Sequence, residues 1–170
     1  LATMLWRVMQ ANGSQAVTPT SARYSDVPAT HWASDAIRQL QAQQIMLGVS
    51  ANTFAPNRPL TRAEFATLAV RWQKLTPTSA SATSFKDVNG HWAAASIATL
   101  VETGVVKGYS DGTFRPNEGV TRAELVTMMN RLLKRGPLTG VTTPTWKDVP
   151  AAHWAFGDIE ESSLSHIYEV

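Results

Sequence analysis

The stretch Gly119-Val120-Thr121-Arg122-Ala123-Glu124-Leu125 and its near copy, Pro59-Leu60-Thr61-Arg62-Ala63-Glu64-Phe65, decide how this chain is organised. In both stretches a Thr is followed three residues later by a Glu and then by apolar residues. This pattern predicts a capping box at the start of a helix, in which the Thr hydroxyl and the Glu carboxylate each accept a backbone N–H. The residues expected to be structural caps are therefore Thr61, Glu64, Thr121 and Glu124.

Capping does not explain the arginine inside each box. Arg62 and Arg122 fall in the first helical turn, at the positive end of the helix dipole, where a cation gains nothing. A basic side chain beside free helix N–H groups is favourable when an anion docks there. We therefore predict that Arg62 and Arg122 contact an anionic ligand. The alternative is a salt bridge, or packing of the arginine stem on a neighbour.

Outward from the boxes, an aromatic-x-Asp-Val motif recurs at intervals of 61 residues, and a His-Trp-Ala follows each copy. The three motifs start at Tyr24, Phe85 and Trp146, and the three His-Trp-Ala segments start at His31, His91 and His153. Repeats of this kind predict similar units that pack side by side. The spacing of apolar residues predicts first helices at about 33–45, 93–104 and 155–165. The capping boxes predict second helices at about 62–75 and 122–135, and the alignment of the start of the chain with them predicts another at about 1–11.

These helices divide the chain into four segments. They are the second helix of a truncated preceding repeat (1–12), two complete repeats (24–75 and 85–135), and the first half of a degenerate final repeat (146–170). The linkers 13–23, 76–84 and 136–145 are rich in Pro, Ser, Thr or Gly and lack the apolar content to fold alone. One repeat buries too little apolar surface to be stable by itself. We therefore expect one mainly α domain, a pseudo-threefold bundle of helix–loop–helix repeats with short extended loop segments.

Composition narrows the classes of function. The 170 residues suffice for a hydrophobic core, and no apolar run approaches the roughly 20 residues of a membrane span. Cysteine is absent, which excludes disulfides and thiolate metal sites. The net charge is +2, with the basic excess in residues 1–145 and an acidic remainder. This balance favours an anionic partner and is too small to indicate nucleic acid.

Together these motifs resemble the S-layer homology family, whose repeat runs from aromatic-x-Asp-Val through His-Trp-Ala and Gly-x-x-x-Gly to Thr-Arg-Ala-Glu. The resemblance covers nearly all of the chain outside the linkers. The second repeat carries the pattern as Phe85–Val88, His91–Ala93, Gly104 to Gly108, Asp111–Pro116 and Thr121–Glu124. The resemblance implies a bundle of three repeats with grooves between neighbours, located outside the cell at the bacterial cell surface or cell wall.

For function, the resemblance implies non-covalent anchoring of a protein to the cell wall. The implied ligand is an anionic, often pyruvylated, secondary polysaccharide attached to peptidoglycan, and the implied main contacts are Arg62 and Arg122. Other surface-layer subunits or the rest of the parent chain are further candidate partners. No cofactor, metal, nucleic-acid partner or membrane span is expected. The alternative function is a structural module that makes protein–protein contacts in a surface lattice or exported protein.

Further candidate ligand contacts recur with the repeats. The tryptophans either stack on a sugar face or belong to the core; they are Trp32, Trp92 and Trp154. The motif aspartates are expected to accept backbone N–H bonds as in Asx-turns, with ligand contact as the alternative; they are Asp26, Asp87 and Asp148. Gly48 and Gly108 are expected to form turns, and their missing side chains would also let a ligand approach the backbone.

The remaining recurrent groups are expected to be structural. Catalysis is not predicted, because the carboxylates of Glu64 and Glu124, the pair that a glycosidase would need, are explained by capping. Arg7, Arg71 and Arg131 recur within the second helices, where packing or pairing with an acid is favoured. The three motif histidines are expected to cap or pack and not to bind metal. A solvated helix face is expected for Asp158, Glu160, Glu161 and His166.

Overall fold

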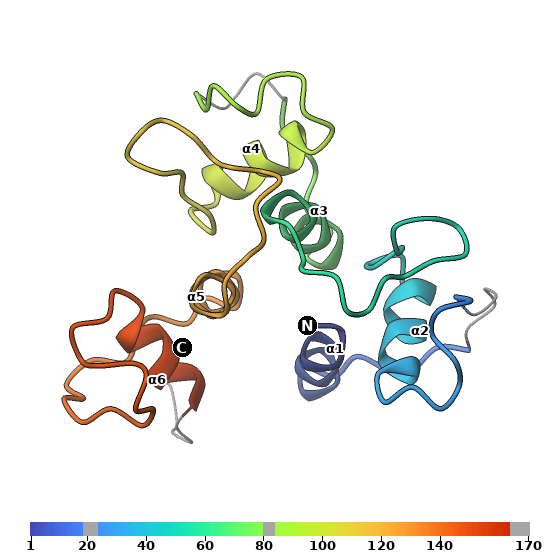
Figure 1. The fold of residues 1–170 in the computed structure, drawn as a ribbon, viewed down its shortest axis with the longest axis horizontal. Helices are drawn as coiled ribbons and strands as arrows, with labels where there is room; N and C mark the ends of the chain where they lie inside the picture. The colour runs from blue at the N-terminus through green and yellow to red at the C-terminus, as the bar shows by residue number, and fades with distance from the viewer. Residues whose placement is uncertain (19–23, 80–83, 164–170) are drawn as a thin grey trace. The chain divides into compact units, whose positions relative to one another are not determined.

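The computed structural model describes residues 1–18, 24–79 and 84–163. Within them the chain is mainly α, as the repeat pattern predicts (Figure 1). The helices are α1 (Ala2–Ala11), α2 (Ser34–Ala42), α3 (Arg62–Trp72), α4 (Ala94–Glu102), α5 (Arg122–Leu132) and α6 (Phe156–Ser163). The first-helix positions of the repeats are α2, α4 and α6, and the second-helix positions are α1, α3 and α5. The only β pairing among the described residues is an isolated antiparallel bridge between Thr61 and Gly119.

The chain forms two compact units. The first comprises Leu1–Pro59 and Leu68–Leu75, and the second comprises Leu60–Thr67 and Thr76–Val170. A single domain with threefold symmetry stays a prediction. Each unit has its own core, because the apolar faces of its helices and the aromatic residues of its loops are buried.

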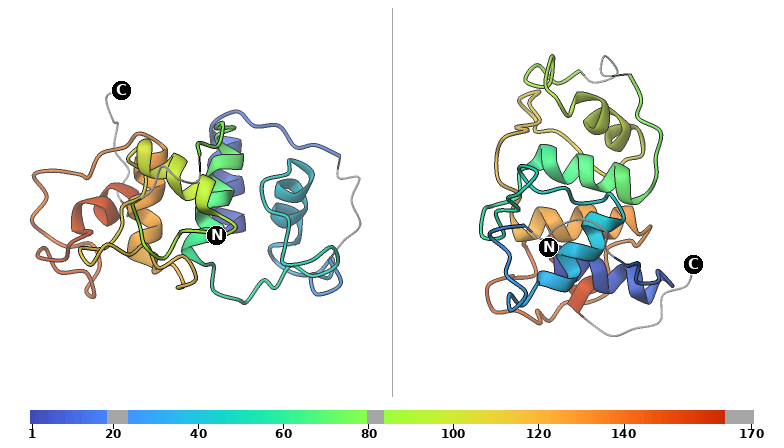
Figure 2. Two further views of the ribbon diagram at one scale, coloured as in Figure 1. Left: turned by 90° about the horizontal axis from the view of Figure 1, so that it is seen from above. Right: turned by 90° about the vertical axis from the view of Figure 1, so that its right-hand side faces the viewer.

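In the first unit, α1 packs against α2. Leu5 and Leu40 are fully buried, and Met9, Ile37 and Ile45 are nearly so. Ile37 and Leu40 follow the helical spacing that predicted α2. In the second unit, α5 packs against α6, and the two helices lie side by side in Figure 1 and in the left view of Figure 2.

Four helices, α2 to α5, end earlier than predicted. The expected helix 33–45 ends as α2 at Ala42, and the expected helix 93–104 ends as α4 at Glu102. Gln44 and Gly104 then adopt left-handed backbone conformations, with φ of 61° and 72°. Such a residue after the last turn redirects the chain. Lys74 and Lys134 do the same after α3 and α5, with φ of 51° and 58°.

The aromatic-x-Asp-Val motif fixes the long loop of each complete repeat. Asp87 accepts hydrogen bonds from the backbone N–H groups of Phe114 (2.9 Å) and Arg115 (2.7 Å). Asp26 bonds the equivalent amides of Phe54 (2.9 Å) and Ala55 (2.7 Å) in the first unit. The expectation that these aspartates accept backbone N–H bonds therefore holds, but the bonds join segments almost thirty residues apart and not neighbours in an Asx-turn.

The motif's aromatic ring packs on the glycine of the same loop. The Phe85 and Phe114 ring centroids lie 5.7 Å apart. A Cβ on Gly108 would meet Phe85 Cε1 at only 2.0 Å. Gly108 has an ordinary φ, so the structure explains it by this close approach and not by the turn that the sequence predicted. Gly48 combines both reasons, because its φ is 72° and a Cβ there would meet the Thr53 carbonyl oxygen at 2.6 Å.

Across the described ranges, no helix is both long enough and apolar enough to cross a membrane.

Candidate functional site

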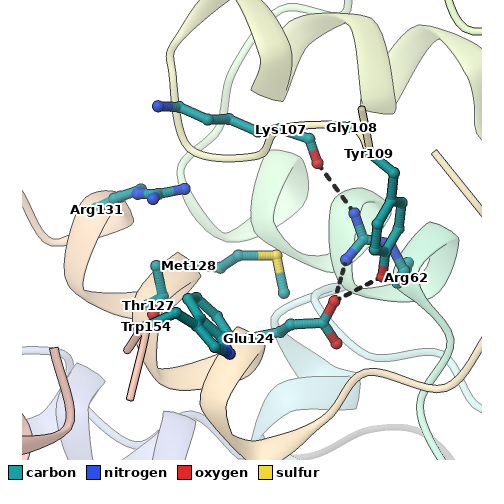
Figure 3. Close-up of a pocket in the computed structure, with 9 residues that line it drawn as sticks. All are labelled: Arg62, Lys107, Gly108, Tyr109, Glu124, Thr127, Met128, Arg131 and Trp154. Carbon is teal, nitrogen blue, oxygen red and sulfur yellow. Dashed lines mark hydrogen bonds and ion pairs between the residues drawn. The ribbon is translucent and has the colours of Figure 1, made fainter. Parts of the chain in front are cut away.

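A groove of about 310 Å³ lies in the second unit, and we call it the α5 groove (Figure 3). Its lining comes from the start of α3, the loop before the Asp111 turn, α5, and the residue preceding α6 by two positions. The lining residues are Arg62, Lys107, Gly108, Tyr109, Glu124, Thr127, Met128, Arg131 and Trp154.

Arg62 lies in the wall of the α5 groove and is only 5% exposed. Its Nε donates to the Phe114 carbonyl (2.8 Å), and its Nη2 donates to the Lys107 carbonyl (3.1 Å). Its Nη1 forms an ion pair with Glu124 at 2.8 Å. The guanidinium carbon also lies 4.5 Å from the Phe114 ring centroid, within cation–π distance. These contacts realise the salt-bridge alternative for Arg62, and direct ligand contact by Arg62 stays a prediction.

Glu124 is the polar centre of this wall. It closes the capping box of α5 with Thr121 and accepts a hydrogen bond from the Tyr109 hydroxyl at 2.9 Å, in addition to the Arg62 ion pair. Burial raises the pKa of Glu124, but the hydrogen bonds and the Arg62 charge outweigh burial and hold that pKa below its ordinary value. The carboxylate is therefore ionised at neutral pH and fixed by several donors.

The start of α3 has no spare N–H groups for an anion. The Arg62 amide donates to the Glu118 carbonyl (3.0 Å), and the Ala63 amide donates to the Pro116 carbonyl (2.9 Å). The Glu64 amide donates to the Thr61 hydroxyl (3.2 Å), and the Thr61 amide donates to the Glu64 carboxylate (2.8 Å). The idea that free helix-start amides assist ligand binding is wrong at this helix, because the next repeat's loop already occupies them.

The opposite side of the groove carries cations with few partners. Arg131, on α5, is half-buried, and its Nη1 lies 3.5 Å from the Val105 carbonyl, at the limit of a hydrogen bond. Lys107 is exposed. In Figure 3 the end of the Lys107 side chain and the Arg131 guanidinium lie apart from the cluster of Arg62, Tyr109 and Glu124.

The tryptophans of the three His-Trp-Ala segments are exposed. The exposed fractions are 80%, 65% and 64% for Trp32, Trp92 and Trp154. The core alternative is therefore wrong for these side chains, and the stacking alternative stays a prediction. Only Trp154 lines the α5 groove.

Each motif histidine accepts a hydrogen bond from the backbone two residues later, at the start of a first helix. The Nδ1 atoms of His31, His91 and His153 accept from the amides of Ala33, Ala93 and Ala155, each at 3.2 Å. This bond is structural, as expected of the histidines, but it is not a side-chain cap of α2 or α4, because it ends at the amide of the residue that precedes the helix. Each imidazole also lies 5.4 to 5.8 Å, centroid to centroid, from the following tryptophan ring.

The other predicted contacts do not meet at the α5 groove. Gly108 lines the groove. Asp87 does not, but it accepts hydrogen bonds from the Phe114 and Arg115 amides in the loop that follows Gly108. Arg122 and Asp148 are exposed. The predicted contacts in the first unit are Trp32, Asp26 and Gly48. Trp92 is exposed in the second unit and lies outside the groove lining.

Sequence reasoning missed five lining residues, namely Lys107, Tyr109, Thr127, Met128 and Arg131. Lys107 and Tyr109 flank Gly108, and this position next to a motif glycine was the available signal. Arg131 was assigned to packing or acid pairing, whereas the structure shows one weak carbonyl contact and no carboxylate partner among the described residues.

The expectation of a solvated acidic face on α6 is wrong. Glu160 is fully buried and accepts from the backbone amide (2.9 Å) and the hydroxyl (2.6 Å) of Thr145, in the preceding linker. Glu161 is also buried. Asp158 accepts hydrogen bonds from Thr127 and Asn130 on α5. His166 lies outside the described residues.

The fold and its motifs agree with the comparison to known families. The S-layer homology domain matches residues 23–66 and 84–126, and the chain belongs to the S-layer homology family. The two matched segments include the motif aspartates Asp26 and Asp87 and both Thr-Arg-Ala-Glu boxes. The chain is therefore a module of extracellular, cell-surface proteins.

The chain is similar in sequence to three curated proteins. It is 38% identical to a cellulosome-anchoring protein of Acetivibrio thermocellus over 96% of this chain and 37% of that protein. It is 31% identical to the S-layer protein sap of Bacillus anthracis over 81% of this chain and 17% of that protein. An endoglucanase of a Bacillus species is 37% identical over 64% of this chain and 11% of its own length. The chain thus spans well under half of each relative.

Proposed function

We propose that this chain is a non-enzymatic anchoring module that binds an anionic, pyruvylated secondary cell-wall polysaccharide in the α5 groove. The observation that carries the proposal is the charge of the groove, which is lined by three cationic side chains and one carboxylate. That carboxylate, Glu124, is already neutralised by Arg62, so Lys107 and Arg131 are left to attract an anion. Charge-assisted hydrogen bonds to a carboxylate are stronger than neutral ones.

The shape of the groove suits a sugar with an acidic substituent. Trp154 presents an exposed indole at one edge, where it can cover the apolar face of a pyranose ring. Gly108 contributes to the lining without a side chain, because the place where its Cβ would stand is filled by the Phe85 ring. Arg62 holds the loop that carries Gly108 by bonding the Lys107 and Phe114 carbonyls.

The experiment is co-sedimentation with purified bacterial sacculi that are intact or stripped of secondary polymer. The wild type should sediment with intact sacculi and remain in solution with stripped ones. Trp154→Ala should weaken binding, whereas Trp146→Ala, an exposed tryptophan outside the groove lining, should bind like the wild type. Equal binding to both kinds of sacculi would contradict the proposed ligand, and failure to bind either kind would contradict anchoring by this groove.

The alternative is a structural module that makes protein–protein contacts in a surface layer or with its parent chain. The exposed apolar side chains of the first unit, Trp32, Leu47 and Val49, favour it. It predicts self-association in analytical ultracentrifugation that depends on protein concentration and is unchanged by Trp154→Ala. A monomer at all concentrations that binds intact sacculi would exclude assembly of copies of this chain as its role.

A further inference from the structure

We propose that Asn89 is a site of spontaneous covalent modification, at which the side-chain amide is lost and aspartate or isoaspartate forms. The chain has two Asn-Gly pairs, Asn12-Gly13 and Asn89-Gly90, and the fold protects the first pair and leaves the second open to reaction. The reaction requires no partner other than water. It is independent of the proposed function.

The chemistry requires an asparagine followed by an unhindered backbone amide. The Gly90 nitrogen attacks Asn89 Cγ and forms a C–N bond, and the side-chain amide leaves as ammonia, so that a five-membered succinimide ring closes. Water then adds to one of the two ring carbonyls. Opening at one carbonyl gives aspartate, and opening at the other gives isoaspartate, in which the main chain runs through the former side chain. Glycine favours ring closure because no Cβ stands beside the attacking nitrogen.

The peptide group between Asn89 and Gly90 is held by no hydrogen bond to any described residue, and both residues are exposed. The turn around this peptide group is closed at its ends, because the His91 amide donates to the Val88 carbonyl at 3.0 Å. Gly90 has a φ of 72°, as the third residue of a type II turn requires. Glycine tolerates either sign of φ, so the peptide group can rotate its nitrogen toward Asn89 Cγ without breaking a hydrogen bond. Nothing lies within 4 Å of a Cβ built on Gly90, which leaves room for the ring.

The pair Asn12-Gly13 has the same two residues in a different hydrogen-bond setting. It follows α1, and the Gly13 amide donates to the Gln10 carbonyl at 3.0 Å. The next amide, that of Ser14, donates to the Met9 carbonyl at 2.9 Å. The Gly13 nitrogen therefore cannot turn toward the Asn12 side chain until its own bond breaks. Both residues of this pair are exposed, so exposure does not distinguish it from the second pair.

The modification would change the turn that leads into α4. Either product adds a negative charge there. Isoaspartate also adds one main-chain carbon between Val88 and His91, the two residues whose hydrogen bond closes the turn. The corresponding turns of the first and third repeats contain Pro28–Thr30 and Pro150–Ala152 and no asparagine. Among these three turns, the reaction is therefore particular to the second repeat.

The test follows both pairs in one sample of the purified chain, incubated at mildly alkaline pH in native buffer or in guanidinium chloride. The two asparagines fall in separate tryptic peptides, 8–23 and 87–107. Mass spectrometry measures the replacement of NH₂ by OH in each peptide, and electron-based fragmentation identifies isoaspartate. In native buffer, Asn89 should react about three- to tenfold faster than Asn12, the factor that corresponds to one ordinary hydrogen bond. In guanidinium chloride, the two rates should be similar.

Two variants serve as controls. Asn89→Gln would have to close a six-membered ring, so peptide 87–107 should stay unmodified over the period in which the wild-type peptide is converted. Asn89→Asp supplies the mass and the chromatographic position of the aspartate product. Its peptide should elute apart from that of the isoaspartate product, which has the same mass.

Three outcomes would overturn the proposal. One is a native chain in which Asn12 reacts as fast as Asn89. Another is a native Asn89 that stays intact while the same residue is converted in guanidinium chloride. The third is a preference for Asn89 that persists unchanged in guanidinium chloride, because neighbouring sequence and not the Gly13 hydrogen bond would then set the difference.

Discussion

Arg62 and Glu124 belong to successive capping boxes, and the 2.8 Å ion pair between them joins one box to the next. Glu124 both completes the capping box of α5 and is the counter-ion of Arg62. The two tasks differ in what they require of the side chain, because capping needs only an acceptor whereas the ion pair needs a charge. A substitution can therefore separate them.

Glu124→Gln should keep the cap, since Gln also serves at this position of a capping box, but remove the charge that neutralises Arg62. We expect the free energy of unfolding to fall by about 2–4 kcal/mol, because a buried cation loses its partner. Urea unfolding followed by circular dichroism measures this change. Glu118→Gln, in a 57% exposed carboxylate 3.8 Å from Arg115, should cost no more than about 0.5 kcal/mol. Equal losses in both variants would show that the Arg62 pair has no special weight.

Gly108→Ala should destabilise the loop of the second repeat. The new Cβ would lie 2.0 Å from Phe85 Cε1, so the ring must move away from Phe114. We expect a loss of about 1–3 kcal/mol, the usual range for overpacking. Gly136→Ala is the control, because nothing lies within 4 Å of its added Cβ and its φ is ordinary. Thermal unfolding measures the melting temperature of both variants. An unchanged melting temperature in Gly108→Ala would contradict the close packing of Gly108 on Phe85.

Gln44→Gly should stabilise the protein. Gln44 holds a φ of 61°, a conformation that costs a residue with a side chain about 1 kcal/mol and costs glycine almost nothing. Gly104, with a φ of 72°, occupies the equivalent place after α4. The reciprocal change, Gly104→Gln, should therefore lower the melting temperature, while Gln44→Gly raises it. Changes of the same sign in both variants would contradict this account of the helix ends.

Acid should destabilise the fold through the carboxylates that bond the loops. Backbone N–H bonds hold the pKa of Asp26 below its ordinary value, and they outweigh the effect of burial at Asp87. The bonds from Thr113 lower the pKa of Asp111 to about 2. A carboxylate with a lowered folded-state pKa contributes stability above its unfolded pKa, and that stability is lost as the pH falls. The free energy of unfolding should thus be flat near neutrality and fall between about pH 4 and about pH 2.

The matched variants for this pH profile are Asp87→Asn and Asp148→Asn. Asp87→Asn removes a charge that accepts two amides, so its unfolding free energy should depend less on pH than that of the wild type. Asp148 is exposed, and no hydrogen bond is found for it within the described ranges, so Asp148→Asn should retain the wild-type profile. A profile for Asp87→Asn as steep as the wild type's would show that its lowered pKa does not contribute to the acid sensitivity.

The sequence predicted the features that depend on neighbouring residues. The Thr61–Glu64 and Thr121–Glu124 bonds span three residues, so both partners of each bond lie within the short sequence motif that predicted it. The existence and order of the helices follow from apolar spacing in the same way. The predicted helices at 33–45 and 62–75 were too long, because Gln44 and Lys74 adopt left-handed conformations that are more typical of glycine.

The features that the sequence did not predict depend on distant partners. The acceptors of the Arg62 guanidinium lie 45, 52 and 62 residues further along the chain, so no local pattern could distinguish a bonded arginine from a free one. The burial of Glu160 likewise depends on Thr145 in a linker that composition describes only as polar. The three exposed tryptophans could not be separated from core residues, because an apolar ring next to a helix start suits either place.

The backbone bonds at the start of α3 give a chain of such repeats a direction. The Arg62 and Ala63 amides are satisfied by carbonyls of the loop that precedes the next box, at Glu118 and Pro116. The joint is asymmetric, since the first repeat supplies these two amides whereas its successor returns one amide bond, from Val120 to the Leu60 carbonyl. Repeats joined in this way cannot be exchanged freely, because a transplanted repeat must form these bonds with the loop of its successor as well as its own core. During synthesis, such a joint can form only after the following repeat has emerged from the ribosome.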